Sequence, residues 1–191
     1  MNRRPQVPVR VMRAGVRGLV RPVLGPRMPV ALQRRWLRLV TGALRLRDAG
    51  DPRPAALCLI SPWLDLLGAA WPADRTDAML RPDWLRRCAR DFAGGTDPGA
   101  VELAPLRAQL TGLPPVTLHV GSEEILLDDA VSLARRARAA GVPVDLRRLD
   151  GLWHVAHASA GLVAASTAAV TAFGEALRAR LTADGTASVA G

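Results

Sequence analysis

The chain has 191 residues, 49% of them hydrophobic and 23% charged, a balance typical of one globular domain rather than a disordered segment. The formal net charge is +9, and every one of the 26 basic residues is arginine. This preference for arginine accompanies abundant Ala, Gly and Pro, so we attribute it to coding bias and expect no nucleic-acid partner.

The charge is concentrated at the N-terminus. Residues 1–47 contain twelve Arg and no acid, whereas residues 48–191 contain fourteen Arg and seventeen acids, a net charge of −3. The basic arm has a single aromatic residue, Trp36, which argues against a stacking platform for single-stranded nucleic acid. Contact of residues 1–27 with an anionic membrane remains an alternative.

Cysteine content and hydropathy indicate a cytoplasmic protein. The two cysteines, Cys58 and Cys88, have neither the number nor the spacing of a disulfide framework or a metal site. No apolar run approaches the roughly 20 residues that span a bilayer. The N-terminus lacks the apolar stretch of a signal peptide. We therefore expect no metal and no membrane span.

The first elements along the chain are predicted to be helical. From Val9 to Val23, apolar residues recur at helical spacing with Arg between them, which predicts a basic amphipathic helix. Gly25-Pro26 ends it, and Val30–Leu46 is a second helical stretch. A turn follows at residues 48–52.

Beyond this turn, strands alternate with helices. The predicted strands are Ala55–Ile60, Val116–Val120 and an alternating run over residues 142–146. The predicted helices are Pro82–Phe92, Leu126–Ala140 and Gly161–Leu181. The last ten residues, 182–191, have no pattern and are expected to be mobile. This order predicts an α/β fold with a parallel sheet.

Parallel strands place their carboxyl ends at one edge of the sheet, where ligands bind. The second strand is followed by Gly121-Ser122-Glu123-Glu124, and the third by a loop that carries His154. A carboxylate and an imidazole at neighbouring strand ends could form the acid and base of a catalytic triad. The order of acid before histidine matches that of the α/β hydrolases.

The motifs themselves resemble one family. LISPWLDL (Leu59–Leu66), GGTDP (Gly94–Pro98), LTGLPPVTLHVGSEEILLDD (Leu110–Asp129) and DGLWHVAH (Asp150–His157) are similar to the C-terminal half of the hormone-sensitive-lipase-type esterases, the α/β-hydrolase fold-3 group. Two upstream pieces, Arg21–Leu37 and Leu44–Leu57, resemble lid helices and the end of the helix behind the nucleophile elbow. The resemblance implies a partial α/β-hydrolase fold with about three C-terminal strands.

The resemblance also implies roles for individual residues. His154 matches the family's catalytic histidine, and Glu124 matches the position of its acid. Asp128, one helical turn further on, is the fallback acid. Ala156 replaces a Phe that is often found two residues after the histidine, a change that affects packing more than chemistry. Triad chemistry requires no cofactor, and the family's substrates are small esters.

The family's HGG oxyanion motif and its G-x-S-x-G elbow are both absent from the sequence. None of the serines stands between glycines in that arrangement: Ser61, Ser122, Ser132, Ser159, Ser166 and Ser188. Near Leu39–Ala43, lid-like sequence runs directly into the helix expected behind the elbow. We therefore predict a truncated chain without a nucleophile.

Other reactive side chains are interpreted structurally. His119 lies within a strand and is expected to be packed or hydrogen-bonded, whereas His157 is expected at the surface. Cys58 and Cys88 lie in a strand and a helix rather than on a turn that would present a thiolate. Ser122 adjoins two carboxylates, which disfavour an alkoxide.

The sequence divides into three predicted regions: a basic lid-like helical arm (1–43), the C-terminal part of a hydrolase domain (44–181) and a mobile tail (182–191). The main hypothesis is an inactive relative of carboxylic-ester hydrolases. The alternative is a non-catalytic interaction or membrane-surface module, and a third possibility is a fragment with no selected role. Loss of the first strands would leave the apolar strand at 55–60 as an open edge, through which the chain could pair with itself or with a relative.

Overall fold

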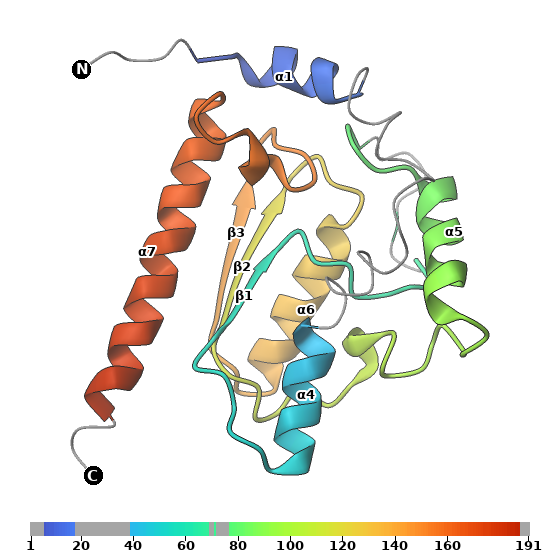
Figure 1. The fold of residues 1–191 in the computed structure, drawn as a ribbon, viewed down its shortest axis with the longest axis vertical. Coiled ribbons are helices and arrows are strands. Elements are labelled where there is room, and N and C mark those ends of the chain that lie inside the picture. The colour runs from blue at the N-terminus through green and yellow to red at the C-terminus, as the bar shows by residue number, and fades with distance from the viewer. Residues whose placement is uncertain (1–5, 18–38, 69–70, 72–76, 188–191) are drawn as a thin grey trace.

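Three parallel strands form the centre of the molecule in a computed structural model that describes residues 6–17, 39–68, 71 and 77–187. Strands β1 (Leu57–Ile60), β2 (Val116–Gly121) and β3 (Val144–Leu149) lie in the order β1-β2-β3 (Figure 1). In register, Leu57 is opposite Val116, which is opposite Val144. The prediction of a three-stranded parallel sheet flanked by helices is confirmed. β1 begins later than expected, and β3 is displaced towards the C-terminus.

Helices cover both faces of the sheet (Figure 1). Helices α4 (Leu39–Ala49) and α6 (Leu127–Ala139) lie on one face, and α7 (Ala164–Ala187) lies on the other. Alternate β2 residues, Val116, Leu118 and Val120, are fully buried in the core beneath α4 and α6. His119 of β2 points to the opposite face, against Phe173 of α7. The central strand is therefore buried on both sides, which explains its unbroken apolar pattern.

The remaining helices are short or peripheral. Helix α5 (Pro82–Ala93) buries Leu85, Cys88 and Phe92 and ends at Gly94, whose left-handed conformation (φ 56°) closes the last turn. The 3-10 helix η2 (Pro105–Arg107) lies between α5 and β2, and a second, η3 (Ala156–Ser159), follows the loop after β3. The predicted helices Pro82–Phe92 and Leu126–Ala140 agree with α5 and α6 to within one residue at either end.

Two helices extend across the expected boundaries between regions. Helix α4 runs without a break through the expected boundary at residues 43 and 44, and Val40, Ala43 and Leu44 lie in the main core. Helix α7 begins at Ala164 and continues to Ala187, so the prediction that it spans Gly161–Leu181 is wrong at both ends. Residues 188–191 of the expected tail lie outside the described residues.

The N-terminal helix α1 (Val9–Gly15) packs against the body of the protein. Val16, just after it, is buried with Leu152 and Trp153, and Val9 and Met12 pack against the same cluster. Arg13 forms an ion pair with Glu123, at 3.2 Å. The apolar side of this predicted amphipathic helix is thus used within the molecule. Its continuation beyond residue 17 and the second stretch up to residue 38 lie outside the described residues.

The two outer strands differ in chemistry. β3 carries Asp145, Arg147 and Arg148, and Arg147 pairs with Asp145 at 3.6 Å. Charged side chains are typical of an edge strand, because they discourage pairing with another chain. β1 consists of Leu-Cys-Leu-Ile and, among the described residues, pairs only with β2. Its composition is that of an interior strand although its position in this sheet is outermost.

A pair of buried histidines lies between β2 and η3. His119 Nδ1 and His157 Nε2 are 3.1 Å apart, and both rings contact Phe173 of α7. The expected hydrogen bonding of His119 is confirmed, but the surface position expected for His157 is wrong, because that residue is only 8% exposed. Burial and the nearby charges of His157 and Arg147, partly offset by Asp145, lower the pKa of His119 to about 4. Burial, opposed by Glu124, also lowers the pKa of His157.

The lowered pKa values of His119 and His157 predict that the folded protein becomes less stable as the pH falls. His119 is neutral when folded and takes up a proton near pH 6.5 when unfolded, so its contribution is complete above pH 6.5 and is lost as the pH falls towards 4. Between pH 7 and pH 5 we expect a loss on the order of 2 kcal/mol from this residue. In urea titrations at both pH values, the His119→Gln variant should lose less stability than wild type over this interval. An equal loss in both proteins would contradict the role of His119.

Candidate active site

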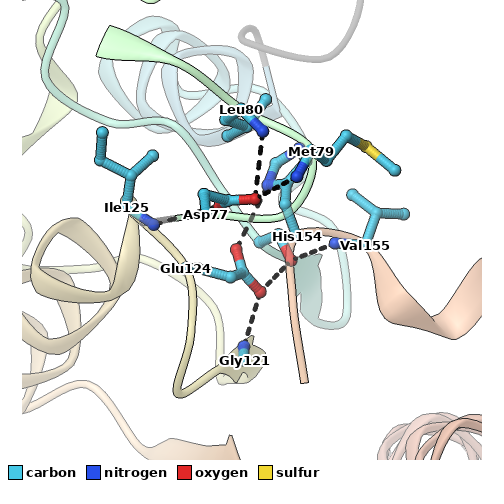
Figure 2. Close-up of polar contacts among 9 residues, drawn as sticks. Asp77, Met79, Leu80, Gly121, Glu124, Ile125, His154 and Val155 are labelled. Carbon is cyan, nitrogen blue, oxygen red and sulfur yellow. Dashed lines mark hydrogen bonds and ion pairs between the residues drawn. The ribbon is translucent and has the colours of Figure 1, made fainter. Parts of the chain in front are cut away.

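The loops that follow the three strands meet at the carboxyl edge of the sheet. β1 leads into Ser61, β2 into the segment from Gly121 to Glu124, and β3 into the loop that carries His154. The parallel arrangement is what brings these segments together, since they are far apart in sequence. Figure 2 shows the resulting group of polar side chains and backbone amides.

Glu124 lies at the centre of this group. Its side chain is 1% exposed. Its Oε1 atom accepts hydrogen bonds from the Gly121 amide at 2.6 Å and from the Ser61 hydroxyl at 2.7 Å. Its Oε2 atom lies 3.2 Å from His154 Nδ1. The carboxylate is thus held from two sides, with its other oxygen presented to the imidazole (Figure 2).

Gly121 is required by the close approach of the loops. A Cβ atom at this position would collide with the backbone carbonyl of Leu152 and would lie 3.1 Å from Glu124 Oε1. Any larger residue would therefore separate the β2 end from the loop that carries His154. The absence of a side chain at Gly121 therefore allows the loop that carries His154 to come close enough for the contact with Glu124.

The geometry determines the tautomer of His154. A carboxylate can only accept, so Nδ1 must carry the hydrogen of this bond, and in the neutral imidazole Nε2 is then the free base. No described residue forms a hydrogen bond with Nε2. Burial alone would lower the pKa of His154, but the hydrogen bond and charge of Glu124, with the charge of Asp77, raise the pKa above its usual value.

Asp77 is a second buried carboxylate near the imidazole. Its Oδ1 atom accepts the amides of Met79 and Leu80 at 2.7 and 3.1 Å, and Oδ2 accepts the amide of Ile125 at 3.2 Å (Figure 2). Burial raises the pKa of Asp77, while His154 and these amides oppose the rise. The residue therefore ties the segment before α5 to the start of α6 and adds negative charge beside His154.

Ser61 bridges the acid and the histidine loop. Its hydroxyl donates to Glu124 and accepts the amide of Val155 at 3.0 Å, and the residue is 5% exposed. Ser61 and Val155 are the non-glycine residues with positive φ among the described residues, at 50° and 51°. A serine with positive φ at a strand end is reminiscent of a nucleophile elbow. Here, however, the hydroxyl bonds to the acid and not to His154 Nε2.

Asp129 supports the segment that follows Ser61. Its Oδ2 atom accepts the amides of Leu64 and Asp65 at 2.9 and 3.1 Å, and its Oδ1 atom has no partner among the described residues. Burial raises the pKa of Asp129 to about 7, with added repulsion from Asp65 and Asp128 and opposition from the two amides. The sequence placed this residue in the first turn of a predicted helix but did not indicate its contact with the segment after Ser61.

The remaining predicted residues have other positions. Asp128, the fallback acid, lies half-buried in the first turn of α6, and the hydrogen bond to His154 is made by Glu124. The Ser122 hydroxyl accepts the Gly151 amide at 2.9 Å and so braces the same loop. Cys58 is half-buried and Cys88 is buried, both as free thiols. Within the described ranges there is no group of three or more side chains that could hold a metal ion.

Ser61 and Asp77 are site residues that the sequence did not predict. Ser61 directly follows a predicted strand, on the same edge as Glu124, and this position was an available signal. Asp77 had no comparable signal, because it lies in an irregular segment that only the tertiary structure brings to His154.

Comparison with known proteins places these features in a family context. A family model described as the alpha/beta hydrolase fold matches residues 39–158. The chain is 44% identical over 123 residues to an acetyl-hydrolase from Streptomyces hygroscopicus, covering 62% of this chain and 41% of that protein. It is 34% identical over 116 residues to an esterase from Acinetobacter venetianus, covering 59% and 38% of the two chains.

Solved structures give the same result. An esterase from the bacterial hormone-sensitive lipase family matches with a TM-score of 0.71 and 37% identity, over 74% of this chain and 48% of that one. A hormone-sensitive lipase from a metagenome library matches with a TM-score of 0.70 and 36% identity, over 74% and 50%. The chain therefore spans about half the length of its structural neighbours and less than half of these curated relatives.

The contact between Glu124 and His154 can be tested without any activity. In Glu124→Gln the hydrogen bond loses its charge while burial of the imidazole remains, so we expect the pKa of His154 to fall. Glu123→Gln is the matched control, because Glu123 is 43% exposed and pairs with Arg13. Titration of the His154 ring signals by NMR measures both. A similar shift in the two variants, or none in Glu124→Gln, would refute the assignment.

Proposed function

Because the chain belongs to the alpha/beta hydrolase family, we propose that Glu124 and His154 are the acid and base of an ester-hydrolase triad whose serine this chain does not carry. The observation that supports this most directly is the 3.2 Å contact between His154 Nδ1 and the buried Glu124 carboxylate. Relatives named as esterases and an acetyl-hydrolase favour a carboxylic ester as the substrate class.

Each residue would have a distinct part in such a reaction. Glu124 holds the Nδ1–H tautomer and stabilises the imidazolium, which leaves Nε2 to take a proton from an attacking hydroxyl. The hydroxyl oxygen then bonds to the carbonyl carbon, and His154 returns the proton to the leaving alcohol. A water molecule then attacks the acyl-enzyme in the same way: His154 takes its proton and returns it to the serine oxygen as the acid product leaves. The chemistry requires neither a metal nor an organic cofactor.

We further propose that this chain alone has no esterase activity. No serine of the sequence lies in an elbow motif, and the HGG segment is absent. Loss of one oxyanion donor alone typically costs about 3–4 kcal/mol of transition-state stabilisation. An acid and a base without nucleophile or oxyanion donors have no covalent route to an acyl-enzyme.

The corresponding experiment is a hydrolysis assay on purified protein with p-nitrophenyl acetate and butyrate. The rate should equal that of His154→Ala, and both should equal the background at the same buffer and pH. A fluorophosphonate probe, which labels activated serines, should leave the protein unmodified. Hydrolysis that disappears in His154→Ala would overturn the proposal.

A second proposal concerns association through β1. Leu57 and Ser61 donate their amides to Pro115 and His119, so both bond to the β2 side. In a parallel pair the alternate residues face away, and the amides of Cys58 and Ile60 therefore point towards the outer edge. An apolar strand with outward amides is a template for pairing with a second copy.

We expect the sedimentation of the protein, in the presence of a reducing agent, to show dimers or larger species that increase with concentration. Cys58→Pro removes one outward amide without touching the bonds to β2, so it should shift the distribution towards monomer. Cys58→Ala, which removes only the thiol, should associate like wild type. A monomer at all concentrations, with a sharp concentration-independent unfolding transition, would contradict the proposal.

The alternative of a membrane-surface module has weaker support. Val9, Met12 and Val16 pack against the cluster around Trp153, so the apolar side of α1 is not available as it stands. None of the helices in the described ranges is both long and apolar enough to cross a bilayer. Salt-sensitive binding to anionic liposomes that is lost on deletion of residues 1–27 would favour this alternative.

A further inference from the structure

We propose that Ser61 is the positioning residue that sets the protonation behaviour of His154, by fixing the Glu124 carboxylate and the histidine loop through one buried hydroxyl. This inference rests on the proposed acid and base roles of Glu124 and His154, and it adds a third residue to them. Ser61 itself does not contact the imidazole in a hydrogen bond.

The first observation is the double use of the hydroxyl. Ser61 Oγ donates its hydrogen to Glu124 Oε1 at 2.7 Å and accepts the Val155 amide at 3.0 Å. Val155 directly follows His154, so the same oxygen holds both partners of the acid–histidine contact. A carboxylate whose Oε1 is occupied by Ser61 and Gly121 presents Oε2 to Nδ1.

The second observation is the backbone conformation. Ser61 and Val155 are joined by a hydrogen bond and both have φ near +50°, a region that side chains with a Cβ rarely occupy. Valine is β-branched, which makes its conformation the more unusual of the two. Such strain persists only where surrounding contacts hold it, and here the hydroxyl is one of those contacts.

The third observation is the orientation of the Ser61 hydroxyl, which excludes a role for this residue as the nucleophile. A nucleophilic serine needs its hydroxyl directed to the base, with room for a carbonyl group beside it. Ser61 is 5% exposed and its hydrogen is given to the acid. Its geometry orients the acid–base pair and does not supply the attacking oxygen.

Two variants separate the hydroxyl from the backbone. Ser61→Ala removes the hydroxyl and keeps the Cβ strain, whereas Ser61→Gly removes the hydroxyl and relieves the strain. If the hydroxyl positions the pair, both should lower the pKa of His154 by a similar amount, and Gly should be the more stable protein. The nitrogen signals of the neutral imidazole should also shift from the Nδ1–H tautomer towards Nε2–H.

Ser122→Ala is the matched control. The Ser122 hydroxyl accepts the Gly151 amide and so supports the same loop, but it forms no hydrogen bond with Glu124. General loosening of the loop would shift the His154 pKa in Ser122→Ala as well, and that result would overturn the proposal. So would an unchanged or raised pKa in both Ser61 variants.

A failure of the positioning role of Ser61 can be distinguished from a failure of the acid and base roles of Glu124 and His154. His154 is assigned by the signals that disappear in His154→Ala, and Glu124→Gln tests the acid by itself. If Glu124→Gln shifts the pKa and the Ser61 variants do not, the positioning role alone fails. If Glu124→Gln has no effect, the acid–base assignment fails with it.

Discussion

A buried carboxylate must be surrounded by donors, and this requirement organises the carboxyl edge of the sheet. Glu124 is 1% exposed and obtains its donors from the ends of all three strands: the Ser61 hydroxyl after β1, the Gly121 amide at the end of β2, and His154 after β3. An isolated buried charge would cost several kcal/mol, so the loops can take this arrangement only together. The acid is therefore a structural centre as well as a chemical group.

The same requirement explains several local features that look unfavourable by themselves. Gly121 permits the approach of Leu152, and positive φ values at Ser61 and Val155 aim an oxygen and an amide at each other. Asp129 and Asp77 accept backbone amides from the irregular segments after β1 and before α5, respectively. Buried carboxylates thus stabilise loops that have no regular hydrogen bonding of their own.

How much of this could be read from sequence depends on the range of the interactions. Apolar runs and helical periodicity predicted the sheet and its helices, because burial by neighbouring elements leaves a local pattern at Val116–Val120 or along α6. Strand ends also placed Glu124 and His154 on one edge. The roles of Asp77 and Asp129 were missed because they come from contacts about 50 to 65 residues away in sequence. Ser61 could have been placed on the same edge from its position after a predicted strand, but its hydrogen bond to Val155, 94 residues away, could not. His157 was misplaced for the same reason: its burial comes from α7 and β2.

The two histidine environments show how the fold controls charge over a short stretch of chain. His154 has a raised pKa, because Glu124 and Asp77 outweigh the effect of burial. Burial lowers the pKa of both His119 and His157, and no carboxylate among the described residues is hydrogen-bonded to either ring to offset it. The contribution of His154 to stability is complete below about pH 6.5 and declines as the pH rises through its folded pKa. That of His119 has the opposite sign of dependence and declines below pH 6.5.

The contact between Glu124 and His154 also has a structural role, which is independent of catalysis. His154 pairs with Glu124, and the pair joins the end of β2 to the loop after β3. Replacing either residue would leave a buried charge or an unfilled donor at the point where three strand ends meet. The pair therefore stabilises the folded chain whether or not a hydroxyl ever reaches Nε2, and its presence by itself does not require catalysis.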